Sequence, residues 1–195
     1  MMPKRLRSRK TLFLGLALIL VTGAVTAPLY GSGGGTSSSR NHVKVQLHDA
    51  TGANVGFVKL TKQGGKVIVR GEVSGLTPGF HGFHVHGIGQ CVPPFTSAGG
   101  HYNPGGTTHG SHAGDMPALL VMDDGSAAAQ FSTDRFAVAE LFDADGSAII
   151  VHAAPDNLAN IPSRYQSTTE GVFGPDSATL ATGDAGGRVA CGVVD

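Results

Sequence analysis

Short, valine-rich segments separated by glycine-containing turns run from His42 to the end of the chain. In the first of them, Val43, Val45 and Leu47 alternate with polar residues, which is the period-two pattern of a half-buried strand. The chain holds 30 glycines and no tryptophan, a composition that fits short strands joined by turns. The pattern predicts an all-β domain, an antiparallel sandwich or barrel of about eight strands. The expected strands are residues 43–48, 54–61, 66–73, 80–86, 118–122, 127–132, 148–152 and 189–194.

Two long segments, residues 87–117 and 153–187, interrupt this rhythm of strands and turns. Loops longer than about 12–15 residues inside a compact domain are usually functional or disordered. The first segment carries four side chains that could bind a metal ion, so we expect it to have a function.

The first 30 residues have the layout of a secretory signal. A basic stretch at residues 4–10 precedes an apolar run at residues 12–21, and small residues follow. Cleavage would make this segment a signal peptide. Without cleavage it would be a signal anchor, because the apolar stretch 11–27 is near the lower limit of about 17 residues for a membrane span.

Residues 31–41 are rich in glycine and serine and are expected to form a flexible tether to a domain at residues 42–195. That domain should work outside the cytoplasm, in the periplasm, at the cell surface or in the medium. Contact with a membrane is expected only through residues 1–30, if they are not cleaved.

Charge is distributed unevenly along the chain. The formal net charge of the whole chain is zero. From residue 41 onward, however, there are 8 basic and 14 acidic side chains, which gives a net charge of −6. A domain this acidic is a poor candidate for nucleic-acid binding, which needs a basic surface. The only two cysteines, Cys91 and Cys191, indicate one disulfide, because an even pair in an exported chain is usually oxidised.

Six of the nine histidines fall into a few short clusters. His84 and His86 lie one residue apart on an expected strand, so both project from the same face and can bind one ion. Together with His152 they form a nitrogen-rich set without thiolate, which suits Cu(II) and also zinc. Each histidine alone would more often be a surface or hydrogen-bonded residue, but the grouping indicates a metal site.

A second set combines His101 with His109, His112 and Asp115. Three imidazole nitrogens and one carboxylate oxygen make a closed tetrahedral set, which suits structural zinc. The sequence therefore predicts two metal sites whose ligands come from the first long loop and from two strands.

The residues around these ligands resemble the copper/zinc superoxide dismutases, and the match covers essentially all of residues 42–195. The resemblance implies an eight-stranded antiparallel Greek-key barrel with two long functional loops. The matching segments are Gly82–His86, Gly99–Pro104, His112–Asp115, Val151–His152 and Gly183–Gly192.

The same resemblance assigns roles to individual residues. It implies that His101 is shared between the two metals, that Asp156 hydrogen-bonds a ligand of each metal, and that Arg188 guides superoxide to copper. It also implies the disulfide between Cys91 and Cys191. The implied copper ligands are His84, His86, His101 and His152, and the implied zinc ligands are His101, His109, His112 and Asp115.

One departure concerns zinc. The stretch between His109 and His112 is several residues shorter than in the family pattern, although every zinc-type ligand is present. The sequence therefore predicts copper and leaves zinc occupancy open.

The implied activity is the conversion of superoxide to oxygen and hydrogen peroxide by alternate reduction and oxidation of a histidine-bound copper ion. This would protect against superoxide outside the cytoplasm. Three alternatives are a metal-binding relative without activity, a copper-delivery protein and a hydrolytic zinc enzyme. Copper-delivery proteins favour methionine and cysteine, and the chain has four methionines and two cysteines. The resemblance allows a homodimer as well as a monomer.

Overall fold

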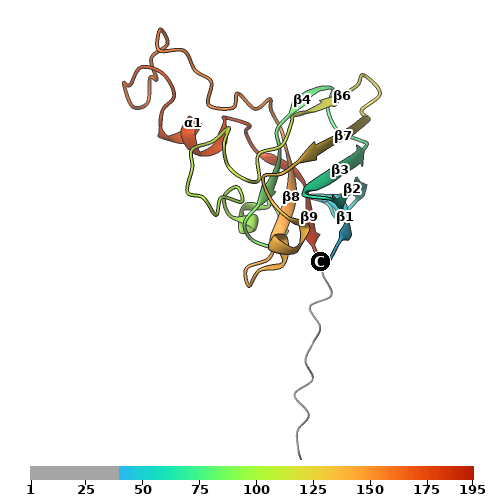
Figure 1. Ribbon diagram of the computed structural model, residues 1–195. Helices are drawn as coiled ribbons and strands as arrows, with labels where there is room; N and C mark the ends of the chain where they lie inside the picture. Colours follow the sequence, from blue (N-terminus) through green and yellow to red (C-terminus); the bar gives the residue numbers. More distant parts are fainter. Residues whose placement is uncertain (1–39) are drawn as a thin grey trace, which may run out of the picture. The chain divides into compact units, whose positions relative to one another are not determined.

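The computed structural model describes residues 40–195. The predictions for residues 1–30 and for nearly all of the tether lie outside the described residues. Figure 1 shows a domain made largely of strands, with two long loops on one side. Within residues 40–195, no helix is long and apolar enough to span a membrane.

Nine strands, two short 3₁₀ helices and one α-helix occur in the described residues. The strands are β1 (His42–Asp49), β2 (Asn54–Gln63), β3 (Lys66–Val73), β4 (Gly79–His81), β5 (Phe83–His86), β6 (Leu119–Val121), β7 (Ala127–Thr133), β8 (Ser147–His152) and β9 (Arg188–Val194). The helices are η1 (Thr96–Ala98), η2 (Val138–Phe142) and α1 (Ser177–Thr182).

The strands form a curled antiparallel sheet with the order β5-β8-β9-β1-β2-β3-β7, and β4 pairs with β6 beside it. Every strand pair in the described residues is antiparallel. Some neighbours in the sheet follow one another in sequence, such as β1, β2 and β3, whereas others, such as β5 and β8, are far apart in sequence (Figure 1). The prediction of an all-β, barrel-like domain is confirmed.

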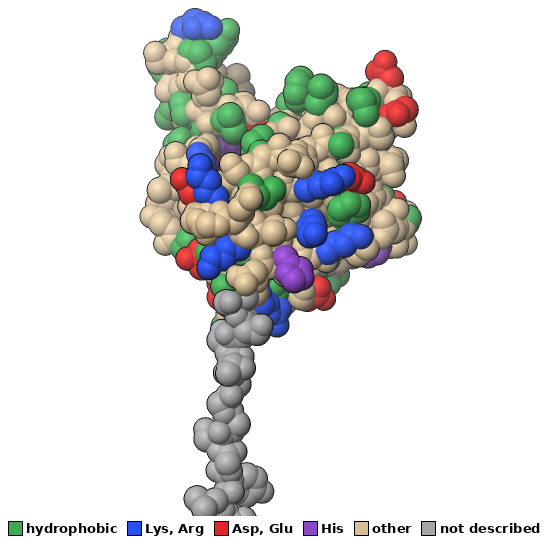
Figure 2. All heavy atoms as spheres, turned by 45° about the vertical axis from the view of Figure 1, so that its right-hand side comes forward, with side chains coloured by type: hydrophobic (Ala, Val, Ile, Leu, Met, Phe, Trp, Pro, Cys, Tyr) green, Lys and Arg blue, Asp and Glu red, His purple; other side chains and the backbone are tan. Residues whose placement is uncertain are grey.

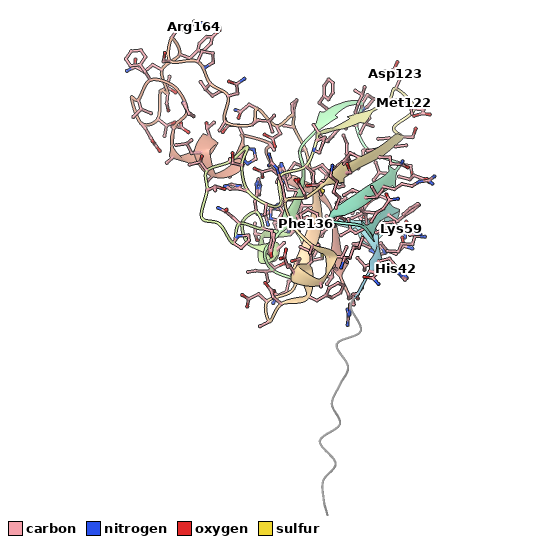
Figure 3. All side chains as sticks on the ribbon, in the orientation of Figure 1. His42, Lys59, Met122, Asp123, Phe136 and Arg164 are labelled. Atoms are coloured by element: carbon pink, nitrogen blue, oxygen red, sulfur yellow. A yellow bond between two sulfur atoms is a disulfide. The ribbon has the colours of Figure 1, made fainter. Side chains whose placement is uncertain are left out.

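Alternation of side chains decides which face of each strand enters the core. In β1, Val43, Val45 and Leu47 are buried and the residues between them are exposed, as the sequence pattern predicted. Burying a side chain of this size contributes about 1.5–3 kcal/mol. On the opposite face of the sheet, His42 and Lys59 point into solvent (Figure 3). Figure 2 shows basic and acidic side chains interspersed on this side.

The strand expected at residues 80–86 is two strands, and Gly82 separates them. β4 pairs with β6, whereas β5 pairs with β8. Gly82 N donates to Ala154 O at 2.9 Å, and Gly82 O accepts from His152 N at 2.8 Å. A Cβ on Gly82 would lie 2.7 Å from Ala185 Cβ, so the loop that follows β8 can approach only a glycine. The prediction missed this break because its cause is a distant segment.

The two long loops are present, between β5 and β6 and between β8 and β9. The first contains η1 and the second contains α1, which the sequence analysis did not predict. The predicted disulfide joins the first loop to β9 through Cys91 and Cys191, with 5.7 Å between the two Cα atoms. Closing a loop of 100 residues contributes up to about 4.7 kcal/mol by restricting the unfolded chain.

Candidate metal centre

β5 and β8 place three histidines on the outer face of the sheet. In β5, Phe83 and Val85 enter the core, so His84 and His86 project from the other side. His152 ends β8, which pairs with β5. All three histidines are buried, at 0%, 0% and 4% exposure, because the long loops cover this face.

The first loop runs beside β5 and is fixed to it by main-chain hydrogen bonds. Val85 N donates to Gly114 O at 2.9 Å, and Tyr102 N donates to Val85 O at 2.8 Å. His101 therefore lies next to β5, with its ring centroid 4.0 Å from that of His84.

His84, His86, His101 and His152 each direct one ring nitrogen to a common point, and these four atoms lie within 4.8 Å of one another. The Nε2 atoms of His86 and His152 are 3.3 Å apart. Three of these residues use their other nitrogen elsewhere. His86 Nδ1 lies 3.0 Å from Gly99 O, His152 Nδ1 lies 3.2 Å from Gly186 O, and His84 Nε2 lies 2.6 Å from Asp156 Oδ2.

His84 Nδ1 shows that this group fits a metal ion. Within residues 40–195, this atom and Ser147 Oγ are the only buried side-chain nitrogen or oxygen atoms without a hydrogen-bond partner. An unpaired buried nitrogen costs free energy, and a metal ion at the common point would satisfy it. A site of imidazole nitrogens without thiolate suits copper.

The second set, which we call the zinc-type set, consists of His101, His109, His112 and Asp115. His101 Nδ1 lies 3.0 Å from Asp115 Oδ1, 3.2 Å from His109 Nδ1 and 3.3 Å from His112 Nδ1. Asp115 Oδ1 is 3.3 Å from each of the other two nitrogens. A tetrahedron with zinc–ligand bonds of about 2.0–2.1 Å has edges of about 3.3–3.4 Å, so the four atoms fit zinc. The shortened loop therefore still brings the four candidate ligand atoms of this set together.

Asp156 connects the two sets. Its Oδ2 lies 2.6 Å from His84 Nε2 and its Oδ1 lies 2.8 Å from His109 Nε2. The side chain is 2% exposed, and Leu158 N also donates to Oδ1 at 2.7 Å. A carboxylate in this place fixes the orientation of one imidazole from each set.

The pKa values of His86 and His152 are shifted in the opposite direction to that of His109. Burial lowers the pKa of His86 to about 2, and the nearby His101 adds to this effect. Burial likewise lowers the pKa of His152 to about 3. Burial also acts to lower the pKa of His109, but the carboxylates of Asp115 and Asp156 outweigh it and raise that pKa to about 9. At neutral pH the first two histidines are therefore neutral, as metal ligands must be, whereas His109 must release a proton to bind a metal.

Arg188 lies at the start of β9 beside the first set. Its Nη1 donates to Phe95 O at 2.5 Å and its Nη2 to Gly99 O at 2.6 Å. Gly99 O also contacts His86 Nδ1, so one carbonyl group separates the guanidinium from a ligand. Burial lowers the pKa of Arg188 from its high ordinary value.

The structure brings together every site residue expected from the sequence, but it also uses groups that were not expected. The carbonyl groups of Phe95, Gly99 and Gly186 orient functional side chains. The glycine pairs before His101 and Arg188 were a signal for close backbone approach.

A curled antiparallel sheet that carries two adjacent sets of candidate ligands with one shared imidazole is the arrangement expected of a dinuclear metalloprotein. The family model for copper/zinc superoxide dismutase (SODC) matches residues 54–194. The chain belongs to the copper/zinc superoxide dismutase family.

Relatives in sequence and in structure agree with this assignment. The chain is 37% identical over 187 residues to the Superoxide dismutase [Cu-Zn] of Mycolicibacterium paratuberculosis, covering 89% of this chain and 82% of the relative. It is 47% identical over 133 residues to that of Mycobacterium bovis, covering 63% of this chain and 55% of the relative. The structure of the Cu/Zn superoxide dismutase from Brucella abortus superposes with a TM-score of 0.60 at 28% identity, covering 79% of this chain and 99% of that chain.

Proposed function

We propose that the protein is a superoxide dismutase in which His84, His86, His101 and His152 hold copper, and His101, His109, His112 and Asp115 hold zinc. In the reaction, two superoxide anions and two protons give one molecule of oxygen and one of hydrogen peroxide. The observation that carries the proposal is the position of His101, which belongs to both ligand groups.

Copper would supply the one-electron chemistry that zinc, which has no redox states, lacks. The protein's part is to hold neutral imidazoles in place. In the three histidines other than His101, the second ring nitrogen contacts the Gly99 carbonyl, the Gly186 carbonyl or Asp156. These contacts leave one nitrogen of each ring free for the metal.

His101 is the candidate for proton transfer. Its Nδ1 faces Asp115 and the two zinc-type histidines, so Nε2 is the nitrogen left for the copper side. We assign to Nε2 the uptake of a proton and its return to the forming peroxide. A ring held firmly through Nδ1 can exchange that proton without losing its orientation.

Arg188 is the candidate for attracting the substrate. Superoxide is an anion, whereas the chain from residue 41 onward has a net charge of −6, so the overall field opposes its approach. The guanidinium beside the first set provides a positive charge at short range. Its bonds to the Phe95 and Gly99 carbonyls keep that charge in place.

Export is supported by the disulfide, because disulfides persist in oxidising compartments. The curated mycobacterial relatives are bacterial proteins, so periplasm, cell surface or medium are the matching locations. The signal or anchor at residues 1–30, the tether at 31–41 and a homodimer stay predictions.

Replacement of a copper-type ligand tests the proposal. His152→Ala should abolish both tight copper binding, measured by equilibrium dialysis, and superoxide decay by the copper-treated full chain. His48→Ala is the matched control, because His48 is an exposed histidine of β1. Full activity of His152→Ala would contradict the assignment.

A further inference from the structure

The turn between His109 and His112 contains only Gly110 and Ser111. Its inner side is fixed by one carboxylate, because Asp115 Oδ2 accepts hydrogen bonds from Gly110 N at 2.8 Å and from His112 N at 3.0 Å. The other oxygen, Oδ1, is the one that faces the zinc-type set. The geometry of this set therefore depends on how firmly the turn is held.

Arg135 holds the same turn from its outer side. Its Nη1 donates to the carbonyl oxygens of Gly110 and His112, each at 3.2 Å. These are the two residues whose amide groups bind Asp115. Both main-chain polar groups of each residue are thus fixed, the N–H by a carboxylate and the C=O by a guanidinium.

Contacts within the loop also support the turn, because Thr107 Oγ1 donates to Ser111 O at 2.8 Å and Asp115 N donates to His112 O at 3.2 Å. Among residues 40–195, only Arg135 donates a hydrogen bond to the Gly110 and His112 carbonyls from outside the loop. An open groove of about 460 Å³ borders the turn, lined by Gly110, Asp115 and Arg135 among others. Arg135 follows β7, and its neighbour Phe136 is anchored in the core, 5% exposed, near the centre of the domain in Figure 3. The backbone of Arg135 is therefore anchored by its buried neighbour Phe136, and its guanidinium reaches the turn from there.

We propose that Arg135 is a positioning residue that sets the zinc affinity of the protein by clamping the turn 109–112. The inference rests on the zinc site proposed above. The effect of Arg135 should be confined to zinc. The copper-type histidines other than His101 are oriented by Gly99, Gly186 and Asp156 and not by this turn. Among residues 40–195, the side-chain hydrogen bonds of Arg135 go only to this turn.

The test compares zinc and copper affinities of the full chain, each measured by competition with a chromophoric chelator. Arg135→Met keeps the length of the side chain and removes both donated hydrogen bonds. We expect the dissociation constant for zinc to rise about tenfold, as the loss of two such bonds implies, with copper affinity unchanged. Arg135→Lys retains a charged donor and should restore part of the zinc affinity.

Arg70→Met is the matched control. Arg70 is an exposed arginine of β3 that pairs with Glu72 at 2.7 Å, so its loss should leave zinc affinity unchanged. Wild-type zinc affinity in Arg135→Met would overturn the inference. So would an equal loss of zinc affinity, copper affinity and urea resistance, because that is the result of a general structural role.

The outcomes also separate this inference from the proposed function. A wild-type chain that binds no zinc would overturn both the zinc site and the role of Arg135. A wild-type chain that binds copper without consuming superoxide would overturn the activity alone, and the zinc measurement would still decide on Arg135.

Discussion

At the scale of single residues, each of three candidate ligands is oriented through the ring nitrogen that faces away from the proposed metal position. His86 and His152 each direct one nitrogen to a main-chain carbonyl, and His84 directs one to Asp156. Because the carbonyls belong to glycine-rich segments, the backbone can approach the rings closely. The ligand geometry therefore depends on backbone positions as much as on the histidines.

Arg188 is the residue whose role is easiest to separate from metal binding. Arg188→Ile removes the positive charge beside the first set, so superoxide decay should slow by about tenfold, the lower end of electrostatic effects on association. Copper should stay bound, because all four copper-type histidines remain. Decay rate and copper content measured on the same sample check this.

The control for this change is Arg164→Ile, since Arg164 is exposed and lies in the second loop, far out in Figure 3. It should leave turnover unchanged. Unchanged turnover in Arg188→Ile would remove that residue from the mechanism.

Sequence alone pointed to the candidate ligands, because metal-binding side chains have distinctive chemistry and these residues match a family pattern; the structure places them close together. The sequence could not identify Arg135, whose partners Gly110 and His112 lie 25 and 23 residues earlier in the chain. An arginine after a strand has no local feature that separates this role from solvation.

At the scale of elements, alternation predicted the strands well, because a period of two fixes which face is buried. The break at Gly82 was missed because it arises from contacts with Ala154 and Ala185, which no local pattern records. The helix α1 was also missed, because it has only six residues inside a loop rich in glycine and polar residues.

The end of α1 contacts the site through Gly183. This residue has φ 61° and ψ 20°, a left-handed conformation that ends the helix. A Cβ here would overlap Asp156 Oδ1 and His109 Nε2. These two atoms form one of the two hydrogen bonds through which Asp156 connects the sets. Gly183→Ala should therefore lower the free energy of unfolding by about 1–3 kcal/mol and weaken zinc binding.

Gly64→Ala separates backbone strain from this overlap. Gly64 has nearly the same φ, 60°, but its added Cβ would meet nothing within 4 Å. Its cost should be about 1 kcal/mol, with zinc affinity unchanged. Urea unfolding and zinc titration of both variants provide the comparison, and equal zinc affinities in the two variants would contradict the role of Gly183.

For the whole molecule, stability without metal should depend on pH in a defined direction. His86 and His152 have folded-state pKa values of about 2 and 3, below the unfolded value near 6.5. As the pH falls, these histidines are protonated in the unfolded chain before they are protonated in the folded chain. Their contribution to the free energy of unfolding is therefore complete above pH 6.5 and is lost as the pH falls toward 3 and 2. Asp115 and Asp156, whose pKa values are also lowered, act in the same direction at still lower pH.

His109 changes the pH dependence of stability in the opposite direction, because its pKa is raised to about 9. Its contribution is complete below pH 6.5 and is lost as the pH rises through 9. Urea unfolding of the metal-free chain should therefore show greatest stability near pH 6.5–7. Unfolding at pH 4–5 should take up at least two protons, because burial lowers the pKa values of His84 and His112 as well. Stability that rises as the pH falls from 6.5 to 4 would contradict the protonation states given for the buried histidines.

The decay rate of superoxide, followed directly with the purified full chain carrying copper alone, zinc alone or both ions, is the measurement we would make first. We predict fast decay in both forms that contain copper and only the uncatalysed rate with zinc alone. The form with both ions should be at least as fast, because zinc holds the His101 ring. Stoichiometric copper without superoxide decay would contradict the proposed activity and leave a metal-binding member of the family.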